Sequence, residues 1–128
     1  MAVRAVFDAV VVGGGPSGAT AAEALARAGC SVVLLDRDGR IKPCGGAIPP
    51  RLVRDFAIPD TLIVARARGA RIVAPSARTV DMPIDGGYVG MVDREHFDEA
   101  LRKRAARAGA DGFRYDADGA VVGLAACA

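Results

Sequence analysis

The stretch VFDAVVVGGGPSGATAAEALARAGCSVVLLDRD, residues 6–38, carries the pattern that decides the fold. It opens with an apolar run from Val6 to Val12, passes through three consecutive glycines, and continues into an alanine-rich segment that ends at Gly29. A second apolar run, Val32 to Leu35, follows. Because a helical crossover joins parallel strands, the pattern predicts a strand buried on both faces, a tight turn, a helix and a second parallel strand.

Glycines at positions Gly13, Gly15 and Gly18 stand in a G-x-G-x-x-G arrangement between the predicted strand and helix. The first permits a tight turn, the second lets a pyrophosphate approach the backbone, and the third lets helix and strand pack closely. The helix N-terminus, which Pro16 and Ser17 open, supplies free N–H groups and a partial positive charge for phosphates. The turn therefore predicts a dinucleotide-binding site.

Asp36 stands at the end of the second predicted strand, where a carboxylate accepts hydrogen bonds from the ribose of an adenine dinucleotide. Together with the glycines it favours a ligand-binding turn over a glycine turn without a ligand. FAD and NAD(P) share this fingerprint, so the choice between them stays open on these residues. A 2′-phosphate would be repelled by Asp36, which disfavours NADP here, although the neighbouring Arg37 weakens that objection.

The remaining segments predict short elements. Prolines punctuate residues 41–60, which leaves mostly loop and at most a short helix near Arg51 to Phe56. Loose alternation from Leu62 to Ile84 predicts two or three short antiparallel strands beside the first unit. Asp93 is a predicted N-cap for a helix that ends at Gly109, and one face of that helix carries Phe97, Leu101, Ala105 and Ala108.

Composition and charge argue against several classes of protein. The chain has 128 residues, a formal net charge of +2, only 5% aromatic residues and no Trp, which disfavours a nucleic-acid partner. The apolar run near the N-terminus is too short to span a bilayer. Cys30, Cys44 and Cys127 form no C-x-x-C pair, so they favour reduced thiols in a cytoplasmic protein and give no support to a metal site.

Three stretches together resemble one family of flavoproteins. They are DAVVVGGGPSGATAAEALARAGCSVVLLDR at 8–37, KPCGGAIPPRLVRDF at 42–56 and VDREHFDEALRKRAARAGA at 92–110. On these stretches the chain is similar to the N-terminal part of the geranylgeranyl reductase family, and in particular to its geranylgeranyl diphosphate reductase branch of chlorophyll and bacteriochlorophyll synthesis. Many flavin enzymes share the first stretch, whereas KPCGGAIP is far more particular to this family.

The resemblance implies an oxidoreductase that binds FAD in a fold similar to the aromatic hydroxylases and takes hydride from NADPH. Its substrate would be geranylgeranyl diphosphate or a geranylgeranyl (bacterio)chlorophyll ester, which it reduces to the phytyl form. Peripheral association with a photosynthetic membrane fits such a substrate. Four arginines either attract a diphosphate or an anionic membrane surface, or form the solvated face of a small sheet: Arg66, Arg68, Arg71 and Arg78.

By the same resemblance, Cys44, Gly45 and Gly46 lie near the flavin ring, and Arg94 lies close to the cofactor. The glycines would let backbone approach the ring, and the Cys44 thiol would donate the proton that an unpolarised alkene needs together with a hydride. Two plainer interpretations stay open: Cys44 as a small apolar filler of the loop, and Arg94 as a solvated helix residue. His96 is interpreted as an exposed helix residue.

The sequence is interpreted as an α/β protein, the N-terminal part of an FAD/NAD(P)-binding domain. Its predicted segments are a βαβ unit at 6–40, a Cys-Gly-Gly loop at 41–60, short strands at 61–92, a helix at 93–110 and a divergent tail at 111–128. The family's later glycine-aspartate segment and isoprenoid-binding half do not follow, so we expect a truncated product or fragment, partly disordered beyond Ala110. The alternatives are an inert dinucleotide-binding fragment, or a fragment of another FAD-dependent oxidoreductase or monooxygenase.

Overall fold

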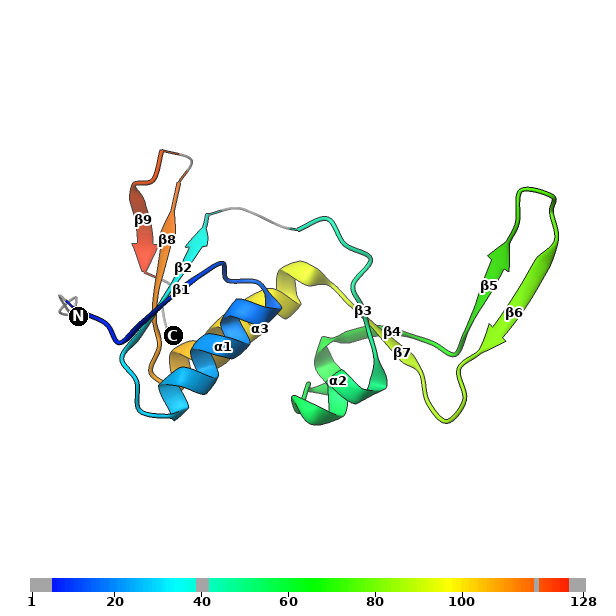
Figure 1. The fold of residues 1–128 in the computed structure, drawn as a ribbon, viewed down its shortest axis with the longest axis horizontal. Coiled ribbons are helices and arrows are strands. Elements are labelled where there is room, and N and C mark those ends of the chain that lie inside the picture. The colour runs from blue at the N-terminus through cyan, green and yellow to red at the C-terminus, as the bar shows by residue number, and fades with distance from the viewer. Residues whose placement is uncertain (1–5, 39–41, 117, 125–128) are drawn as a thin grey trace. The chain divides into compact units, whose positions relative to one another are not determined.

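The computed structural model describes residues 6–38, 42–116 and 118–124 (Figure 1). Within them the chain forms two compact units. The first combines Met1–Lys42 with Phe97–Ala128, and the second is Pro43–His96.

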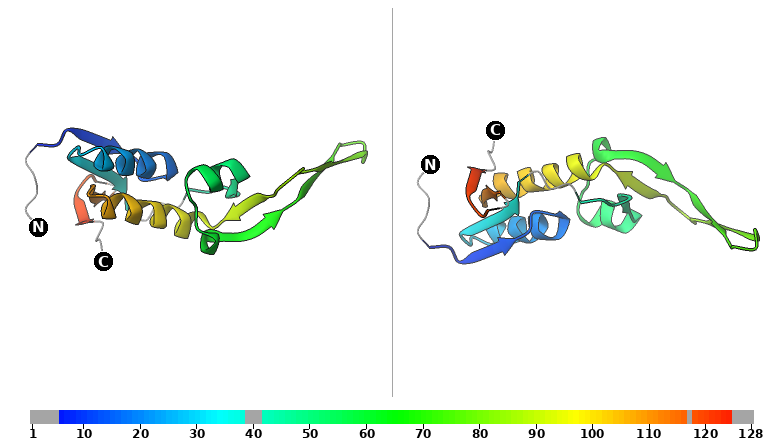
Figure 2. Two further views of the ribbon diagram at one scale, coloured as in Figure 1. Left: turned by 90° about the horizontal axis from the view of Figure 1, so that it is seen from below. Right: turned by 90° about the horizontal axis from the view of Figure 1, so that it is seen from above.

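A four-stranded sheet in the order β1-β2-β8-β9 forms the centre of the first unit (Figure 1). The strands β1 (Ala9–Val12), β2 (Val32–Arg37) and β8 (Asp111–Tyr115) run parallel, and β9 (Val121–Leu124) runs antiparallel to β8. The helix α1 (Pro16–Arg27) joins β1 to β2, as predicted. Figure 2 shows α1 beside α3 (Arg94–Arg107), the helix that precedes β8.

The strand β1 is shorter and more exposed than its apolar run predicts. It begins at Ala9 because Asp8 is bonded to the loop before β2: the Asp8 N–H donates to Ser31 Oγ over 3.0 Å, and the Ser31 N–H donates to Asp8 Oδ2 over 2.8 Å. Val10 and Val12 are 58% and 72% exposed. Burial on both faces was therefore a wrong prediction for β1, which lies at the edge of this sheet.

The inner strand β2 carries the burial that was expected of β1. Val32, Val33 and Leu34 are all buried and pair with β1, and Val33 and Leu34 also pair with β8 on the other side. The alanines Ala19 and Ala22 of α1 are completely buried, which shows how a small-residue helix can pack closely. At the end of α1 the backbone of Gly29 has a φ of +87°, a conformation that suits glycine and confirms the predicted helix stop.

The helix α3 begins and ends as the sequence predicts. The Glu95 N–H donates to Asp93 Oδ1 over 3.0 Å, so Asp93 is the N-cap. Gly109, just past the helix, has a φ of +107°. On the predicted apolar face Phe97, Leu101 and Ala105 are buried and Ala108 is half-buried.

The segment after Ala110 forms strands within the described residues 111–116 and 118–124, in the stretch that the sequence analysis gave as a divergent tail. The strand β8 pairs with β2 from Val33 opposite Asp111 to Arg37 opposite Tyr115. The turn to β9 is closed by Asp116, whose Oδ1 accepts the N–H groups of Asp118 and Ala120, each over 2.9 Å.

The second unit is antiparallel. Its three-stranded sheet has the order β3-β7-β4, formed by β3 (Ala47–Ile48), β7 (Val89–Val92) and β4 (Ile63–Ala67). The short predicted helix is α2 (Pro50–Asp55), and a 3₁₀ turn, η1 (Asp60–Leu62), precedes β4. The predicted short strands are confirmed, but they form sheets of their own and none of them pairs with the parallel sheet.

A two-stranded hairpin, β5 (Gly69–Val73) with β6 (Thr79–Pro83), completes the second unit. Its register places Ile72 opposite Val80 and Arg71 opposite Asp81, so the two pairs lie on opposite faces. Ile72 and Val80 are 55% and 61% exposed. Among the described helices none is both long and apolar enough to cross a membrane.

Candidate dinucleotide-binding site

The glycine turn between β1 and α1 is built by close backbone contacts. Gly13 has a φ of +105°, which favours glycine, and its N–H donates to the Leu35 carbonyl oxygen over 2.7 Å. At Gly18 a Cβ atom would collide with the Gly13 carbonyl oxygen. The predicted roles of the first and third glycines, a tight turn and close packing, are confirmed.

The second glycine of the motif faces open space. Among the described residues, no atom of another residue lies within 4 Å of the position that a Cβ of Gly15 would take. Gly15 is also the N-cap of α1, which begins without a side-chain cap hydrogen bond, and Ser17 in its first turn is exposed. Because the first N–H groups of a helix lack partners within the helix, this opening suits an anion such as a phosphate.

The Asp36 carboxylate lies directly against this turn, as predicted. A Cβ built on Gly14 would be 2.6 Å from Asp36 Oδ2, so only a glycine leaves room for the carboxylate here. Asp36 Oδ1 accepts the Arg37 N–H over 3.0 Å, and the Arg37 side chain itself is exposed. The Asp36 side chain is 20% exposed and can therefore be reached by a ligand.

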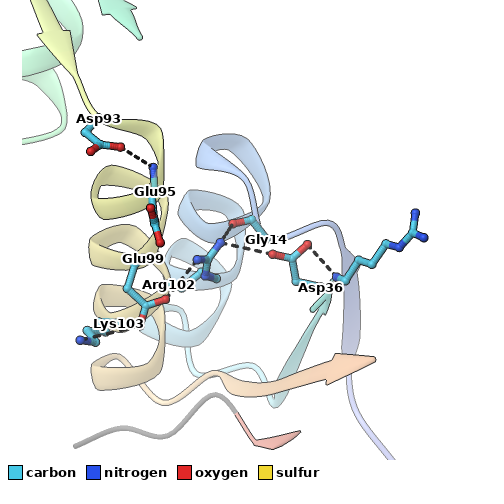
Figure 3. A network of polar contacts seen from close by, with 8 residues as sticks. Gly14, Asp36, Asp93, Glu95, Glu99, Arg102 and Lys103 are labelled. Carbon is cyan, nitrogen blue, oxygen red and sulfur yellow. Dashed lines mark hydrogen bonds and ion pairs between the residues drawn. The ribbon is translucent and has the colours of Figure 1, made fainter. Parts of the chain in front are cut away.

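Arg102 is a site residue that the sequence did not reveal. Its Nη1 donates to the Gly14 carbonyl oxygen over 3.1 Å and lies 3.3 Å from Asp36 Oδ2, while Nη2 lies 3.1 Å from Glu99 Oε2 (Figure 3). Arg102 lies among other basic residues in the C-terminal half of α3, and nothing in its sequence neighbourhood signals a partner 66 positions away. The one sequence feature consistent with a contact between Arg102 and Asp36 is that their charges are opposite.

The Cys-Gly-Gly loop belongs to the second unit, and backbone contacts hold Gly46 in place. Gly46 is buried with a φ of +69°, its carbonyl accepts the Val92 N–H over 2.9 Å, and a Cβ on it would collide with the Val92 carbonyl oxygen. The Gly46 N–H donates to Cys44 Sγ over 3.5 Å. Cys44 and Gly45 are exposed.

The start of α3 carries two residues singled out in the sequence. Arg94 is half-buried, and it belongs to the second unit with Cys44, Gly45 and Gly46, whereas the glycine turn and Asp36 belong to the first. His96 is exposed, as predicted, with Nδ1 3.1 Å from Asp93 Oδ2. The Glu95 N–H, and secondarily His96, hold the pKa of Asp93 below its usual value.

Arginines on the antiparallel strands are partly engaged within the protein. Arg66 lies 3.2 Å from Asp60 and stacks over the Tyr88 ring at 5.1 Å, and the contact with Tyr88 raises the pKa of its guanidinium. Arg71 is paired with Asp81 at 2.6 Å. These pairs favour the interpretation of a solvated face.

Cysteines and acids give no metal centre in the described part of the chain, where no group of three or more His, Cys, Asp or Glu side chains could hold a metal ion. Cys30 is half-buried, and Cys127 lies outside the described residues.

A parallel βαβ unit whose glycine turn meets an acidic residue defines the class of dinucleotide-binding α/β domains. Residues 11–79 match the family of NAD(P)-binding Rossmann-like domains, and the chain belongs to this family. It is 66% identical over 105 residues to a geranylgeranyl diphosphate reductase of Rhodobacter capsulatus, a match that covers 82% of this chain and 27% of that protein. The chain therefore spans about a quarter of the length of this relative.

Solved structures agree with this assignment. A geranylgeranyl bacteriochlorophyll reductase-like protein from Thermoplasma acidophilum superposes with a TM-score of 0.76 at 28% identity, over 92% of this chain and 34% of that one. A myxobacterial chondrochloren halogenase, a variant of FAD-dependent halogenases, superposes with a TM-score of 0.72 at 25% identity, over 87% of this chain and 29% of that one. The predicted α/β fold and the resemblance to geranylgeranyl reductases are confirmed.

Proposed function

We propose that the chain is the FAD-binding N-terminal part of a geranylgeranyl diphosphate reductase that uses NADPH and forms phytyl side chains for chlorophyll or bacteriochlorophyll. The observation that carries this proposal is the open turn at Gly15 beside the Asp36 carboxylate, in a chain 66% identical to such a reductase over 105 residues. The name of the relative is the basis for the proposed activity, and the turn is the basis for the proposed binding of a dinucleotide.

The first unit contains residues that fit the ADP half of FAD. The pyrophosphate would be held at the start of α1 by Gly13, Gly15, Pro16, Ser17 and Gly18. Two features support this role: the free space at Gly15 and the absence of a side-chain cap on α1 within the described residues. Asp36, with Arg37 beside it, would accept hydrogen bonds from the ribose hydroxyls. A carboxylate at this position suits the unphosphorylated ribose of FAD better than that of NADPH, which we place elsewhere as the reductant.

The second unit contains the residues proposed for the flavin end, Cys44, Gly45, Gly46 and Arg94. When bound, FAD would take a hydride from NADPH and deliver it to one carbon of an isolated alkene. The adjacent carbon must then gain a proton. We assign that proton to the exposed Cys44 thiol: its S–H bond breaks as the new C–H bond forms, and the thiolate regains a proton from solvent. The Gly46 N–H, 3.5 Å from Sγ, would stabilise the thiolate.

The proposed substrates are geranylgeranyl diphosphate and the geranylgeranyl ester of (bacterio)chlorophyll, as the names of the relatives suggest. Such long isoprenoid chains partition into lipid, so we propose a cytoplasmic enzyme that associates peripherally with the membrane that holds its substrate.

Reconstitution of a reductase that contains this chain as its N-terminal part, with FAD, NADPH and geranylgeranyl diphosphate, tests the proposal. The expected result is one bound FAD, NADPH oxidation, and a product heavier by two hydrogens for each double bond reduced. Bound FAD without product would favour an inert dinucleotide-binding fragment, and insertion of oxygen would favour a monooxygenase. Absence of bound FAD would refute the assignment of the turn.

The role of Cys44 is tested by Cys44→Ser and Cys44→Ala, with Cys30→Ser as the matched control. Cys30 is a half-buried thiol in the first unit with no part in the proposed chemistry. We expect the Cys44 variants to bind FAD normally and to lose turnover by about a hundredfold, the usual effect of removing a general acid. Turnover at the rate of the Cys30 control would exclude Cys44 as the proton donor.

A further inference from the structure

We propose that Arg102 is a positioning residue of the dinucleotide site. Arg102 holds the Asp36 carboxylate against the glycine turn, so that this carboxylate can accept hydrogen bonds from the hydroxyls of an adenosine ribose. This inference rests on the proposed function, because it concerns how the same site recognises its ligand. Arg102 would act through Asp36, without contact to the ligand.

The geometry of the guanidinium supports this role. Nη1 of Arg102 serves both the Gly14 carbonyl oxygen at 3.1 Å and Asp36 Oδ2 at 3.3 Å, and Nη2 is held by Glu99 at 3.1 Å (Figure 3). A planar group fixed at both ends is a rigid brace between α3, the turn and the end of β2. The Arg102 and Asp36 side chains are only 21% and 20% exposed, so solvent and salt screen their attraction incompletely.

The acceptor positions of the carboxylate point to the same conclusion. Oδ1 of Asp36 accepts the Arg37 N–H, and Oδ2 faces Arg102. A carboxylate offers about four acceptor positions, so after these two contacts about two remain. Two is also the number of hydroxyls on an adenosine ribose. Arg102 and the backbone therefore fix the orientation of the group and leave the acceptors that the ligand needs.

The charge of Arg102 addresses a second difficulty. The same turn is proposed to receive a diphosphate, and a lone carboxylate beside it would repel that ligand. A guanidinium in contact with Asp36 offsets the negative charge while the carboxylate keeps its hydrogen-bonding geometry. Lys103 lies 3.7 Å from Glu99, the other acidic residue that contacts Arg102, and offsets its negative charge in the same way.

The test compares ligands with and without ribose hydroxyls. Affinities of the purified protein for FAD, ADP and 2′,3′-dideoxy-ADP are measured by titration for the wild type, Arg102→Met and Arg102→Lys. The matched control is Arg104→Met, because Arg104 lies on the same helix and is paired, at 3.3 Å, with Glu23 of α1. Thermal melts of every variant, without ligand, report damage to the fold.

We expect Arg102→Met to weaken the binding of all three ligands, because the charge of Asp36 is then no longer offset, but to weaken FAD and ADP about tenfold more than dideoxy-ADP, the value of one charge-assisted hydrogen-bonding arrangement. Arg102→Lys should recover part of the discrimination, since an ammonium can still pair with Asp36. In an Asp36→Asn background, Arg102→Met should have little further effect. Arg104→Met should lower the melting temperature and leave the ratio of ADP to dideoxy-ADP affinity unchanged.

Equal losses for ADP and dideoxy-ADP in Arg102→Met would overturn the inference, because they would indicate direct phosphate contact or general damage. An unchanged ratio in a folded variant would overturn it as well, while the FAD site itself would stand. If Arg102→Met does not fold, Arg102→Gln replaces it, with an expected ratio between those of Arg102→Met and the wild type because the amide N–H can still donate to Asp36. A wild-type protein that binds none of the three ligands would refute the proposed function and this inference with it.

Discussion

Gly15→Ala separates the binding role of the glycine turn from its structural role. Gly15 has φ −72° and ψ −176°, an extended conformation that alanine adopts without strain. Among the described residues, no atom of another residue lies within 4 Å of the new methyl group. The methyl would instead project into the space that we assign to a phosphate. We therefore expect a folded protein that has lost affinity for dinucleotides.

The size of each effect can be estimated from these contacts. Replacement of glycine by alanine at a compatible site stabilises by about 0.4–1 kcal/mol, whereas alanine at an N-cap costs about as much, so stability should change by less than about 1 kcal/mol. A hydrogen bond from a backbone N–H to a phosphate oxygen needs about 2.9 Å, which a methyl group in between prevents. Loss of one such charge-assisted bond weakens binding by about tenfold to a hundredfold.

The assay is FAD and ADP titration of the Gly15→Ala protein, with thermal melts of the unliganded protein. Gly18→Ala is the matched control: its methyl would collide with the Gly13 carbonyl oxygen, so it should unfold more easily, by about 1–3 kcal/mol, and bind poorly for that reason. Wild-type affinity in Gly15→Ala would refute the assignment of this space to a phosphate. A large loss of stability in Gly15→Ala would refute the reading of the turn geometry.

Three further predictions concern stability and solubility. Glu23→Gln removes the charge of the buried carboxylate that pairs with Arg104 and Arg27, and it should destabilise the protein by about 1–2 kcal/mol in denaturant titrations. Arg27→Gln, at an Arg27 side chain that is 69% exposed, should cost less than about 0.5 kcal/mol. The pKa of Asp93 in the folded protein lies below its ordinary 3.8, so the stabilising effect of its carboxylate is complete above that pH and is lost as the pH falls through the lowered pKa. Asp93→Asn still caps α3 but does not titrate, so its melting temperature should lack this part of the acid dependence. Identical pH profiles for the variant and the wild type would contradict this prediction. Ile72→Thr on the exposed hairpin face should reduce light scattering of concentrated protein without lowering its melting temperature.

Local patterns predicted the parts of the fold that local interactions determine. The strand, glycine turn and helix up to Gly29 follow from turn geometry and helix stops that act within a few residues. The N-cap at Asp93 follows in the same way. Asp36 was found because its place in a βαβ unit is constrained by the length of the helix. Arg102 could not be found, because its contacts with Gly14 and Asp36 depend on how α3 packs, which no local signal records.

The end of β2 shows why the site depends on more than its motif. The pairing with β1 ends where Val12 meets Leu35, so Asp36 lies beyond the last paired residue of that strand. On the other side β8 continues, with Asp36 opposite Arg114 and Arg37 opposite Tyr115. The backbone that carries the carboxylate is therefore held by β8, and from the turn by the Gly13 N–H bonded to the Leu35 carbonyl oxygen. Since a carboxylate recognises ribose only if its backbone is fixed, the strand β8 supports the residue on which the proposed dinucleotide binding depends.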